Sequence, residues 1–335
     1  MRIPRPPRSR SVRLALGLAL SFAAARPGAA APAGDGADAI PRGFYDAVRQ
    51  ASVEILVNDH LEGTGWIADA SGVVCTVAHA VREGSRIEAR LDGAGRIAVQ
   101  VLALDRGHDL ALLRLPARDG GYPALPLADG LPPAGNPVYL YGHPIFRRGL
   151  LVRGNVARND AAFQFSPSFR DYTEIVYLAA SAAPGMSGGP WVDARGAVVG
   201  VQSQIVTVDK TVHGLAMAAP VDAIRELLRR RETILSPTIG AAMDETWQLG
   251  SDYLKTLPPR TEGPVVMKLS EGGPAAKAGL KEKEVIVGAD GQPVPTVDAL
   301  LRRIRAKSPG DTVTLRILTP NGGGERDVAV TLGSY

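Results

Sequence analysis

Short runs of apolar and β-branched residues recur between residues 52 and 221, and glycines and prolines separate them. Strands of this length and spacing are typical of an all-β sandwich or barrel. The predicted strands cover residues 53–57, 64–67, 73–76, 87–91, 99–102, 110–115, 138–141 and 197–201. A short helix is expected over residues 44–50, and apolar residues at helical spacing predict another over residues 221–231. We take this last helix as the end of a first domain, residues 44–231.

The remaining residues, 235–335, combine predicted strands with one amphipathic helix and therefore form a second, smaller unit of α+β type. The helix covers residues 297–305, and Asn-Gly-Gly-Gly at residues 321–324 predicts a hairpin turn. The predicted strands cover residues 265–269, 284–287, 312–318 and 326–332. The expected fold class is thus mainly β in the first domain, followed by a smaller α+β domain.

Residues 1–30 have the layout of a secretory signal peptide: arginines, then an apolar run over residues 14–25, then small residues. As a helix, this apolar run would rise only about 18 Å, against a membrane core of about 30 Å. A cleaved leader is therefore favoured, and a membrane anchor is the alternative. Residues 31–43, rich in Ala, Pro and Gly, are the expected linker. The expected location is periplasmic or secreted.

The net charge of +4 belongs to this leader, because residues 1–30 carry six arginines and no acid. The rest of the chain is slightly acidic, which gives no support for nucleic-acid binding. The single cysteine, Cys75, excludes an intramolecular disulfide and lies in an apolar run, where a buried strand residue is expected. The chain contains no CxxC or HExxH pattern, so no metal site is predicted.

Candidate chemistry centres on the run Gly-Met-Ser-Gly-Gly at residues 185–189. Glycines beside a serine let a substrate backbone approach and let amide N–H groups converge on one point. Acyl transfer needs both a nucleophile and such an oxyanion hole. Ser187 is the expected nucleophile, and the amides of Gly185 and Ser187 are the expected oxyanion donors. By itself the run could equally be an ordinary turn.

Two other segments supply what a serine nucleophile lacks. His79 follows a predicted strand, and Asp109 directly precedes another. Imidazole titrates near neutrality and can accept the serine proton, while a buried carboxylate fixes its tautomer. The chain order His, Asp, Ser is that of the chymotrypsin barrel. Asp105 competes for the acid role, but the strand begins right after Asp109, which favours Asp109.

The segments GTGWI, TVAHAV, HDLALLRL, PGMSGGP and HGLAMAAPVD resemble the HtrA/Deg family of trypsin-like serine proteases, over about residues 50–335. The resemblance implies a chymotrypsin-like double β-barrel without a cofactor. It also implies that His79 is the general base, that Asp109 orients it and that Ser187 attacks. Met186 stands where the family has Asn; because this residue should contribute mainly backbone, activity is expected to survive.

The resemblance also places the pocket for the substrate side chain. Its base would lie at Ser181, six residues before the nucleophile, beside Ala182. The opposite wall would be formed by Gln202, Ser203 and Gln204. Since none of these positions carries a carboxylate, a preference for Lys or Arg is disfavoured, and a medium aliphatic side chain is expected.

Residues 239–332 resemble a PDZ domain of the HtrA kind, a module that binds peptide C-termini by strand addition. The backbone amides after Thr238, including Ile239 and Gly240, would hold the peptide carboxylate. Lys283 and Glu284 replace the family's usual Gly-Asp. A PDZ-like packing domain that binds no peptide is the alternative.

Two functional hypotheses follow. The first is a serine endopeptidase that hydrolyses unfolded or damaged envelope proteins; the second is a catalytically silent chaperone or PDZ scaffold. The resemblance also implies a homotrimer packed through Phe44 and Tyr45, which could instead be ordinary core residues. A short loop over residues 58–63 argues against larger cages. Whether the resting oxyanion hole is formed stays open from the sequence.

Overall fold

The computed structural model describes residues 40–82, 84–208 and 211–335. The expected signal peptide and all but the end of the expected linker lie outside the described residues. None of the helices in the described part of the chain is long and apolar enough to cross a membrane.

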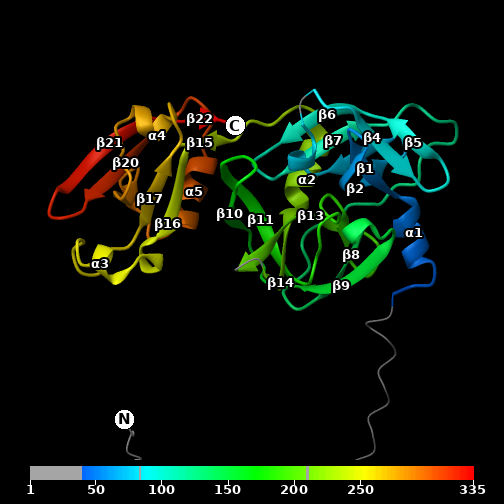
Figure 1. The fold of residues 1–335 in the computed structure, drawn as a ribbon, viewed down its shortest axis with the longest axis horizontal. Coiled ribbons are helices and arrows are strands. Elements are labelled where there is room, and N and C mark those ends of the chain that lie inside the picture. The colour runs from blue at the N-terminus through cyan, green and yellow to red at the C-terminus, as the bar shows by residue number, and fades with distance from the viewer. Residues whose placement is uncertain (1–39, 83, 209–210) are drawn as a thin grey trace, which may run out of the picture. The chain divides into compact units, whose positions relative to one another are not determined.

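The first β-sheet has seven antiparallel strands in the order β5-β4-β1-β2-β3-β7-β6 (Figure 1). They are β1 (Ser52–Val57), β2 (His60–Asp69), β3 (Val73–Thr76), β4 (Ile87–Leu91), β5 (Gly95–Ala98), β6 (Gln100–Asp105) and β7 (Leu110–Arg114). Asn58 and Asp59, with φ of 48° and 71°, form the turn between β1 and β2. Two residues with positive φ are what a tight hairpin turn needs. The loop expected over residues 58–63 is therefore shorter than predicted, because β2 already begins at His60.

The second sheet also has seven strands, in the order β10-β11-β14-β13-β12-β8-β9. They are β8 (Pro137–Gly142), β9 (Leu150–Val156), β10 (Ala162–Ser166), β11 (Asp171–Ala179), β12 (Pro190–Val192), β13 (Val198–Val208) and β14 (Thr211–Pro220). Because β9 also pairs with β11, six of these strands close into a ring. The predicted pair of antiparallel β-barrels is confirmed.

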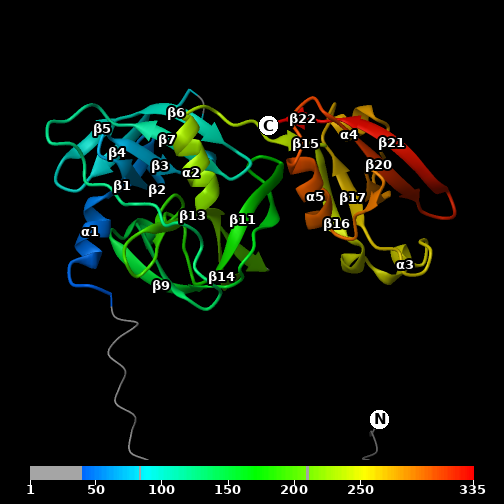
Figure 2. The ribbon, with the colours of Figure 1, turned by 180° about the vertical axis from the view of Figure 1, so that it is seen from behind.

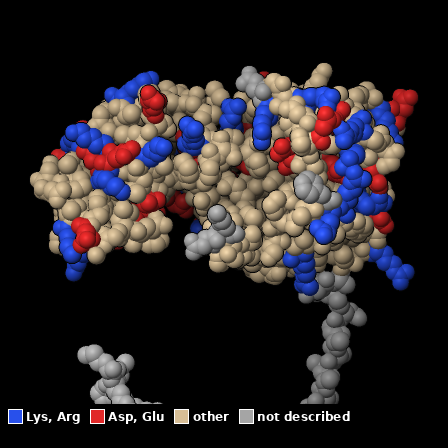
Figure 3. Space-filling model, viewed as in Figure 1, with Lys and Arg blue, Asp and Glu red and all other residues tan. Residues whose placement is uncertain are grey.

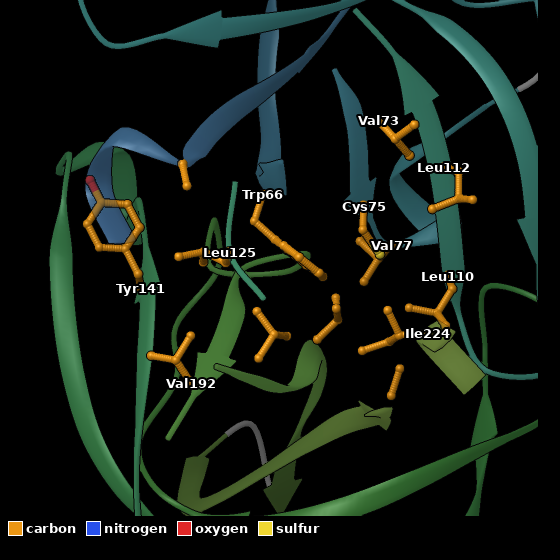
Figure 4. Close-up of a cluster of buried hydrophobic side chains, with 14 of the residues drawn as sticks. Trp66, Val73, Cys75, Val77, Leu110, Leu112, Leu125, Tyr141, Val192 and Ile224 are labelled. Atoms are coloured by element: carbon orange, nitrogen blue, oxygen red, sulfur yellow. The ribbon is translucent and has the colours of Figure 1, made fainter. Parts of the chain in front are cut away.

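A shared hydrophobic core joins the two barrels (Figure 4). Trp66, Cys75 and Leu110 come from the first sheet, and Val192 from the second. Helix α2 (Val221–Arg230) adds Ile224, and helix α1 (Phe44–Gln50) adds Phe44 and Val48. Cys75 is fully buried, as expected, and burial raises the pKa of its thiol. This core fixes where the strand ends of the two barrels meet.

The C-terminal unit is a five-stranded antiparallel path, β16-β17-β18-β20-β21, to which β19 adds a short pairing (Figure 2). Helix α5 (Val297–Arg305) begins with the hydroxyl of Thr296 accepting from the Ala299 amide. The other elements are β15 (Pro237–Thr238), β16 (Ala241–Glu245), α3 (Ser251–Leu254), β17 (Pro264–Leu269), α4 (Pro274–Lys277), β18 (Val285–Ala289), β19 (Gln292–Pro293), β20 (Thr312–Thr319), β21 (Gly324–Thr331) and β22 (Gly333–Ser334). The predicted smaller α+β unit is therefore present.

The core of this C-terminal unit also contains side chains from the preceding barrel, which the sequence did not predict. Phe163 of β10 and Tyr172 of β11 belong to the same buried cluster as Ile239, Leu301 and Ile304. The sequence pattern divides the chain near residues 231–235, but these aromatic side chains pack across that division.

Charged side chains of both signs are interspersed on the face shown in Figure 3. Elsewhere in the described residues several charges are paired: Arg229 and Arg230 both bind Glu226, and Arg326 binds the buried Glu284. This face therefore presents no broad field of one sign, so its charges offer no long-range attraction for a highly charged polymer.

We predict that Trp66→Ala lowers the free energy of unfolding by about 3–5 kcal/mol, because Trp66 is fully buried in the shared core. Trp247→Ala is the matched control, since Trp247 is 74% exposed and its loss should change stability by less than about 0.5 kcal/mol. Urea unfolding followed by far-ultraviolet circular dichroism measures both. Equal unfolding midpoints for the two variants would contradict this description of the core.

Candidate active site

His79 and Asp109 meet because they follow and precede two paired strands. His79 lies in a short 3-10 helix (Ala78–Ala80) just after β3, and Asp109 stands just before β7. Thr76 and Ala111 are partners in the ladder of β3 and β7, so the two strand ends are adjacent. Nδ1 of His79 lies 2.7 Å from Oδ2 of Asp109, and the His79 amide donates to Oδ1 at 2.9 Å. The carboxylate therefore holds both the ring and the backbone of His79.

The protonation of His79 is set by two opposing effects. Burial by itself would lower its pKa, but the neighbouring Asp109 carboxylate raises it, and the net pKa lies above the ordinary value of 6.5. Since Asp109 is fully buried, little water weakens this attraction. The pair therefore stabilises an imidazolium, the form that a general base reaches after it accepts a proton.

Asp105 forms a second, separate pair with His108. Oδ2 of Asp105 lies 2.7 Å from Nδ1 of His108, and Oε2 of Glu174 lies 3.6 Å from Nε2 of the same ring. Burial opposes the charge of His108, but both carboxylates outweigh it and raise its pKa to about 9. Asp105 thus has its own partner, the half-buried His108.

Ser187 is joined to this arrangement through Ser203, a residue of β13. The Ser187 hydroxyl donates to the Ser203 carbonyl at 3.4 Å. The Ser203 hydroxyl donates to Oδ2 of Asp109 at 2.5 Å. Ser203 thus contacts the Asp109 carboxylate directly, and Ser187 is linked to it through the Ser203 carbonyl.

Ser203 therefore has a different place from the one that the sequence indicated. It was expected to line the substrate pocket, but its side chain is buried against Asp109. The side chain of Gln202 is also buried: its oxygen accepts from Trp191 Nε1 at 2.9 Å, and its amide donates to the Gln204 carbonyl. Only the main chain of Gln202 and Ser203 is left to face a substrate. A small hydroxyl two residues after the buried run of residues 198–201 was the available signal.

The other expected pocket residues remain predictions. Ser181 is exposed, Ala182 is buried, and the Gln204 side-chain amide donates to Thr173 at 3.4 Å. None of the three side chains carries a charge, which fits an uncharged substrate side chain.

The turn before Ser187 leaves two amides free to bind an anion. Met186 N–H donates to the Ala183 carbonyl, and Ile145 N–H donates to the Pro184 carbonyl at 2.9 Å. The N–H and C=O of a trans peptide point in opposite directions, so the Gly185 amide points away from Ile145. Among the residues that the structure describes, neither the Gly185 nor the Ser187 amide has an acceptor. These are the two donors expected for an oxyanion hole.

Close packing explains why this turn needs glycine. A Cβ at Gly185 would lie 2.4 Å from the His143 carbonyl oxygen, and one at Gly188 would lie 2.0 Å from the Thr64 carbonyl oxygen. Both glycines also have positive φ, 97° and 83°. The Met186 side chain is buried in the core of the second barrel, which explains how methionine fits between them.

His143 is a buried support of the turn, not a surface histidine. Its Nδ1 accepts from the Gly149 amide at 3.2 Å. Burial, reinforced by the cations Arg148 and Arg90, lowers its pKa to about 4, so the ring is neutral near pH 7.

The expected carboxylate loop, Thr238, Ile239 and Gly240, lies directly before β16. The Gly240 amide donates to the Thr238 hydroxyl at 2.8 Å. That hydroxyl in turn donates to the carboxylate of Asp171, whose pKa is raised by burial. The loop thus lies next to strand β16, where a peptide could bind. The Thr238 hydroxyl and the Gly240 amide, however, already form hydrogen bonds within the chain.

Residues 63–201 match the trypsin-like peptidase domain, and residues 237–332 match the PDZ domain. A probable periplasmic serine endoprotease, DegP-like, of Halomonas elongata is 29% identical over 278 residues, which are 82% of this chain and 56% of that protein. The putative serine protease HhoA of Synechocystis sp. is 29% identical and covers 81% of this chain and 70% of HhoA.

Solved structures agree on the fold. The HtrA-type protease AlgW with decapeptide matches with a TM-score of 0.64 at 19% identity, over 87% of this chain and 98% of that one. The serine endoprotease from Yersinia pestis matches with a TM-score of 0.59 at 21% identity, over 89% of this chain and 100% of that one. The chain spans little more than half the length of its DegP-like relatives, 56% for the Halomonas protein.

No group of three or more metal-binding side chains occurs in residues 40–82, 84–208 and 211–335.

The raised pKa of His108 predicts a pH-dependent contribution to stability. The folded pKa of about 9 exceeds the ordinary 6.5, so the contribution is complete below pH 6.5 and is lost as the pH rises towards 9. We expect the stability advantage of wild type over His108→Gln to be about 3 kcal/mol larger at pH 6 than above pH 9. Urea unfolding at pH 6, 7.5 and 9 measures it, with the exposed His60→Gln as control. A difference that does not change with pH would refute the charged pair.

Proposed function

We propose that this chain, which joins a trypsin-like peptidase domain to one PDZ domain, is a serine endopeptidase of the HtrA type. The observation that carries the proposal is the hydrogen-bonded series from Ser187 through Ser203 to Asp109 and His79. Each residue has the chemistry that acyl transfer needs at its position.

In the proposed mechanism the Ser187 hydroxyl attacks the carbonyl carbon of the scissile peptide bond while His79 accepts its proton. The resulting oxyanion is held by the amides of Gly185 and Ser187. His79 then returns the proton to the leaving amine, and an acyl-enzyme on Ser187 remains. Water, activated by His79 in the same way, attacks the acyl group and releases the second product.

Ser203 is a positioning residue in this mechanism. Its hydroxyl, from the second barrel, donates a hydrogen bond to Oδ2 of Asp109. The Nδ1 of His79, from the first barrel, is hydrogen-bonded to the same oxygen. A charge-assisted hydrogen bond of this kind holds the carboxylate in one orientation. The orientation of Asp109 then determines which ring nitrogen of His79 carries the proton.

The proposed substrates are unfolded or damaged proteins of the cell envelope, and the proposed location is the periplasm. Relatives named periplasmic serine endoproteases and the signal-peptide layout of residues 1–30 support the location, and the substrates are proposed from the family resemblance. The PDZ domain would bind peptide C-termini, as its fold and the peptide-bound HtrA structures suggest.

A homotrimer remains part of the proposal, with one change. Phe44 is buried in the chain's own core, with its ring 5.4 Å from that of Tyr139. Only Tyr45, which is 38% exposed, is left for contacts between subunits. A silent chaperone or scaffold is the competing function; the hydrogen-bonded pair of His79 and Asp109, together with Ser187 in its glycine-rich motif, argues against it.

We predict that a fluorophosphonate probe labels Ser187 and that Ser187→Ala abolishes both labelling and casein cleavage, by more than about a thousandfold. Ser251→Ala, a change at an exposed serine of α3, should leave both intact. Mass spectrometry of the labelled peptide identifies the residue. Cleavage by Ser187→Ala at the wild-type rate would refute the mechanism, and absence of cleavage by wild type would favour the scaffold.

The pH dependence of kcat/KM should rise through the pKa of His79, because only the neutral ring accepts a proton. Since that pKa is raised, the acidic limb should have its midpoint above pH 6.5. Ser203→Ala removes a hydrogen bond to Asp109, so the carboxylate should interact more strongly with the protonated His79 ring and the midpoint should move to higher pH. Because Asp109 also loses a group that orients it, kcat should fall about tenfold. Initial rates on a peptide substrate from pH 5 to 9 measure both; an unchanged profile in Ser203→Ala would contradict its positioning role.

A further inference from the structure

Strand β16 lies at the edge of the PDZ sheet and, within the part of the chain that the structure describes, pairs only with β17. An edge strand leaves N–H and C=O groups unpaired, and PDZ domains use such an edge to bind a peptide as an added strand. In this chain the β10–β11 hairpin of the second barrel lies against β16 and α5 (Figure 2). Three contacts show how closely the hairpin fills this groove.

The first contact is made by Tyr172, at the start of β11. Its hydroxyl accepts from the Met243 amide at 2.8 Å and donates to the Met243 carbonyl at 2.9 Å. Met243 lies in the middle of β16, and its two backbone groups are those that a bound peptide strand would use. The Tyr172 hydroxyl therefore makes the two hydrogen bonds to Met243 that the main chain of one peptide residue would otherwise make.

The second contact is made by Phe163 of β10, whose ring is only 8% exposed. Its amide donates to Oδ1 of Asp298 at 3.0 Å, which ties the hairpin to α5. The guanidinium groups of Arg302 and Arg305 lie 5.9 and 5.8 Å from the ring centroid. The ring thus takes the hydrophobic position between helix and sheet, with cations on its face.

The third contact lies at the loop before β16. The Thr238 hydroxyl donates to the buried carboxylate of Asp171, the residue before Tyr172. The loop expected to bind the terminal carboxylate of a peptide therefore already contacts a carboxylate of the chain itself. The hairpin thus supplies three groups that a bound peptide would bring. They are the carboxylate of Asp171, the hydroxyl of Tyr172 in place of a peptide N–H and C=O, and the aromatic ring of Phe163.

We propose that the β10–β11 hairpin is an internal ligand of the PDZ groove, and that a peptide C-terminus binds only by displacing it. This rests on the proposed capture of peptide C-termini and specifies the ligand. The peptide needs a free carboxylate in place of Asp171 and an aromatic side chain in place of Phe163. Its measured affinity is the intrinsic affinity reduced by the fraction of molecules with an open groove.

The test uses the full chain and a fluorescein-labelled peptide, (Gly-Ser)₄-Tyr-Ala-Phe, with a free C-terminal carboxylate, in a fluorescence anisotropy titration. Tyr172→Phe keeps the ring but removes both hydrogen bonds to Met243, so the Kd of the peptide should fall about tenfold. Phe163→Ala should lower it further. Tyr177→Phe is the matched control, because it makes the same change on β11 outside the C-terminal core. The amidated peptide should bind every variant more weakly.

A second readout does not depend on peptide binding. In Tyr172→Phe the Met243 amide loses its acceptor, so its hydrogen exchange should be faster than in wild type and in Tyr177→Phe. Circular dichroism confirms that each variant folds. If all folded variants bind the peptide with the same Kd, the internal ligand is refuted while peptide capture stands. If no variant binds it, both the internal ligand and the proposed capture of C-termini are refuted.

Discussion

The arrangement at the candidate active site depends on one buried carboxylate, that of Asp109. A buried charge is costly unless it is fully hydrogen-bonded. Asp109 accepts from the amide and ring of His79 and from the hydroxyl of Ser203, so it draws together groups from both barrels. Its φ of 55° is uncommon for a residue with a side chain, though aspartate tolerates it better than most. The convergence of two barrels on Asp109 thus orients the histidine that would activate Ser187.

The turn between β6 and β7 carries two Asp–His pairs with different neighbours. Asp109 binds His79, while Asp105 binds His108, whose Nε2 also lies 3.6 Å from Glu174 in the β10–β11 hairpin. The same hairpin extends Tyr172 into the core of the PDZ domain. Tyr172 is only two residues from Glu174, so one short stretch of β11 contacts both the first barrel and the C-terminal sheet. The hairpin is therefore a structural junction as well as the proposed occupant of the peptide groove.

Local pattern predicted most of the elements and the main chemical groups. Helix 44–50, helix 297–305 and strand 87–91 have the predicted bounds, because their apolar positions repeat at the spacing of the element. His79, Asp109 and Ser187 could be found because each stands in a distinctive short motif. The role of Ser203 could not, since a serine in a strand carries no motif and its partner lies 94 residues away in the sequence. The β10–β11 strands were missed because their polar residues mask the alternation, as in Gln164 and Glu174.

The sequence pattern by itself determined an all-β first domain, the smaller α+β unit and the residue types needed for acyl transfer, because these depend on hydrophobic periodicity and on the chemistry of single side chains; the double barrel was implied by the family resemblance. Tertiary structure decided which partner each group has. It paired Asp105 with His108 instead of His79, turned Ser203 towards Asp109 and placed Tyr172 on the backbone of Met243. Such pairings arise where strands distant in the chain pack together, and the energy of burying a polar group depends on which partner the packing brings to it.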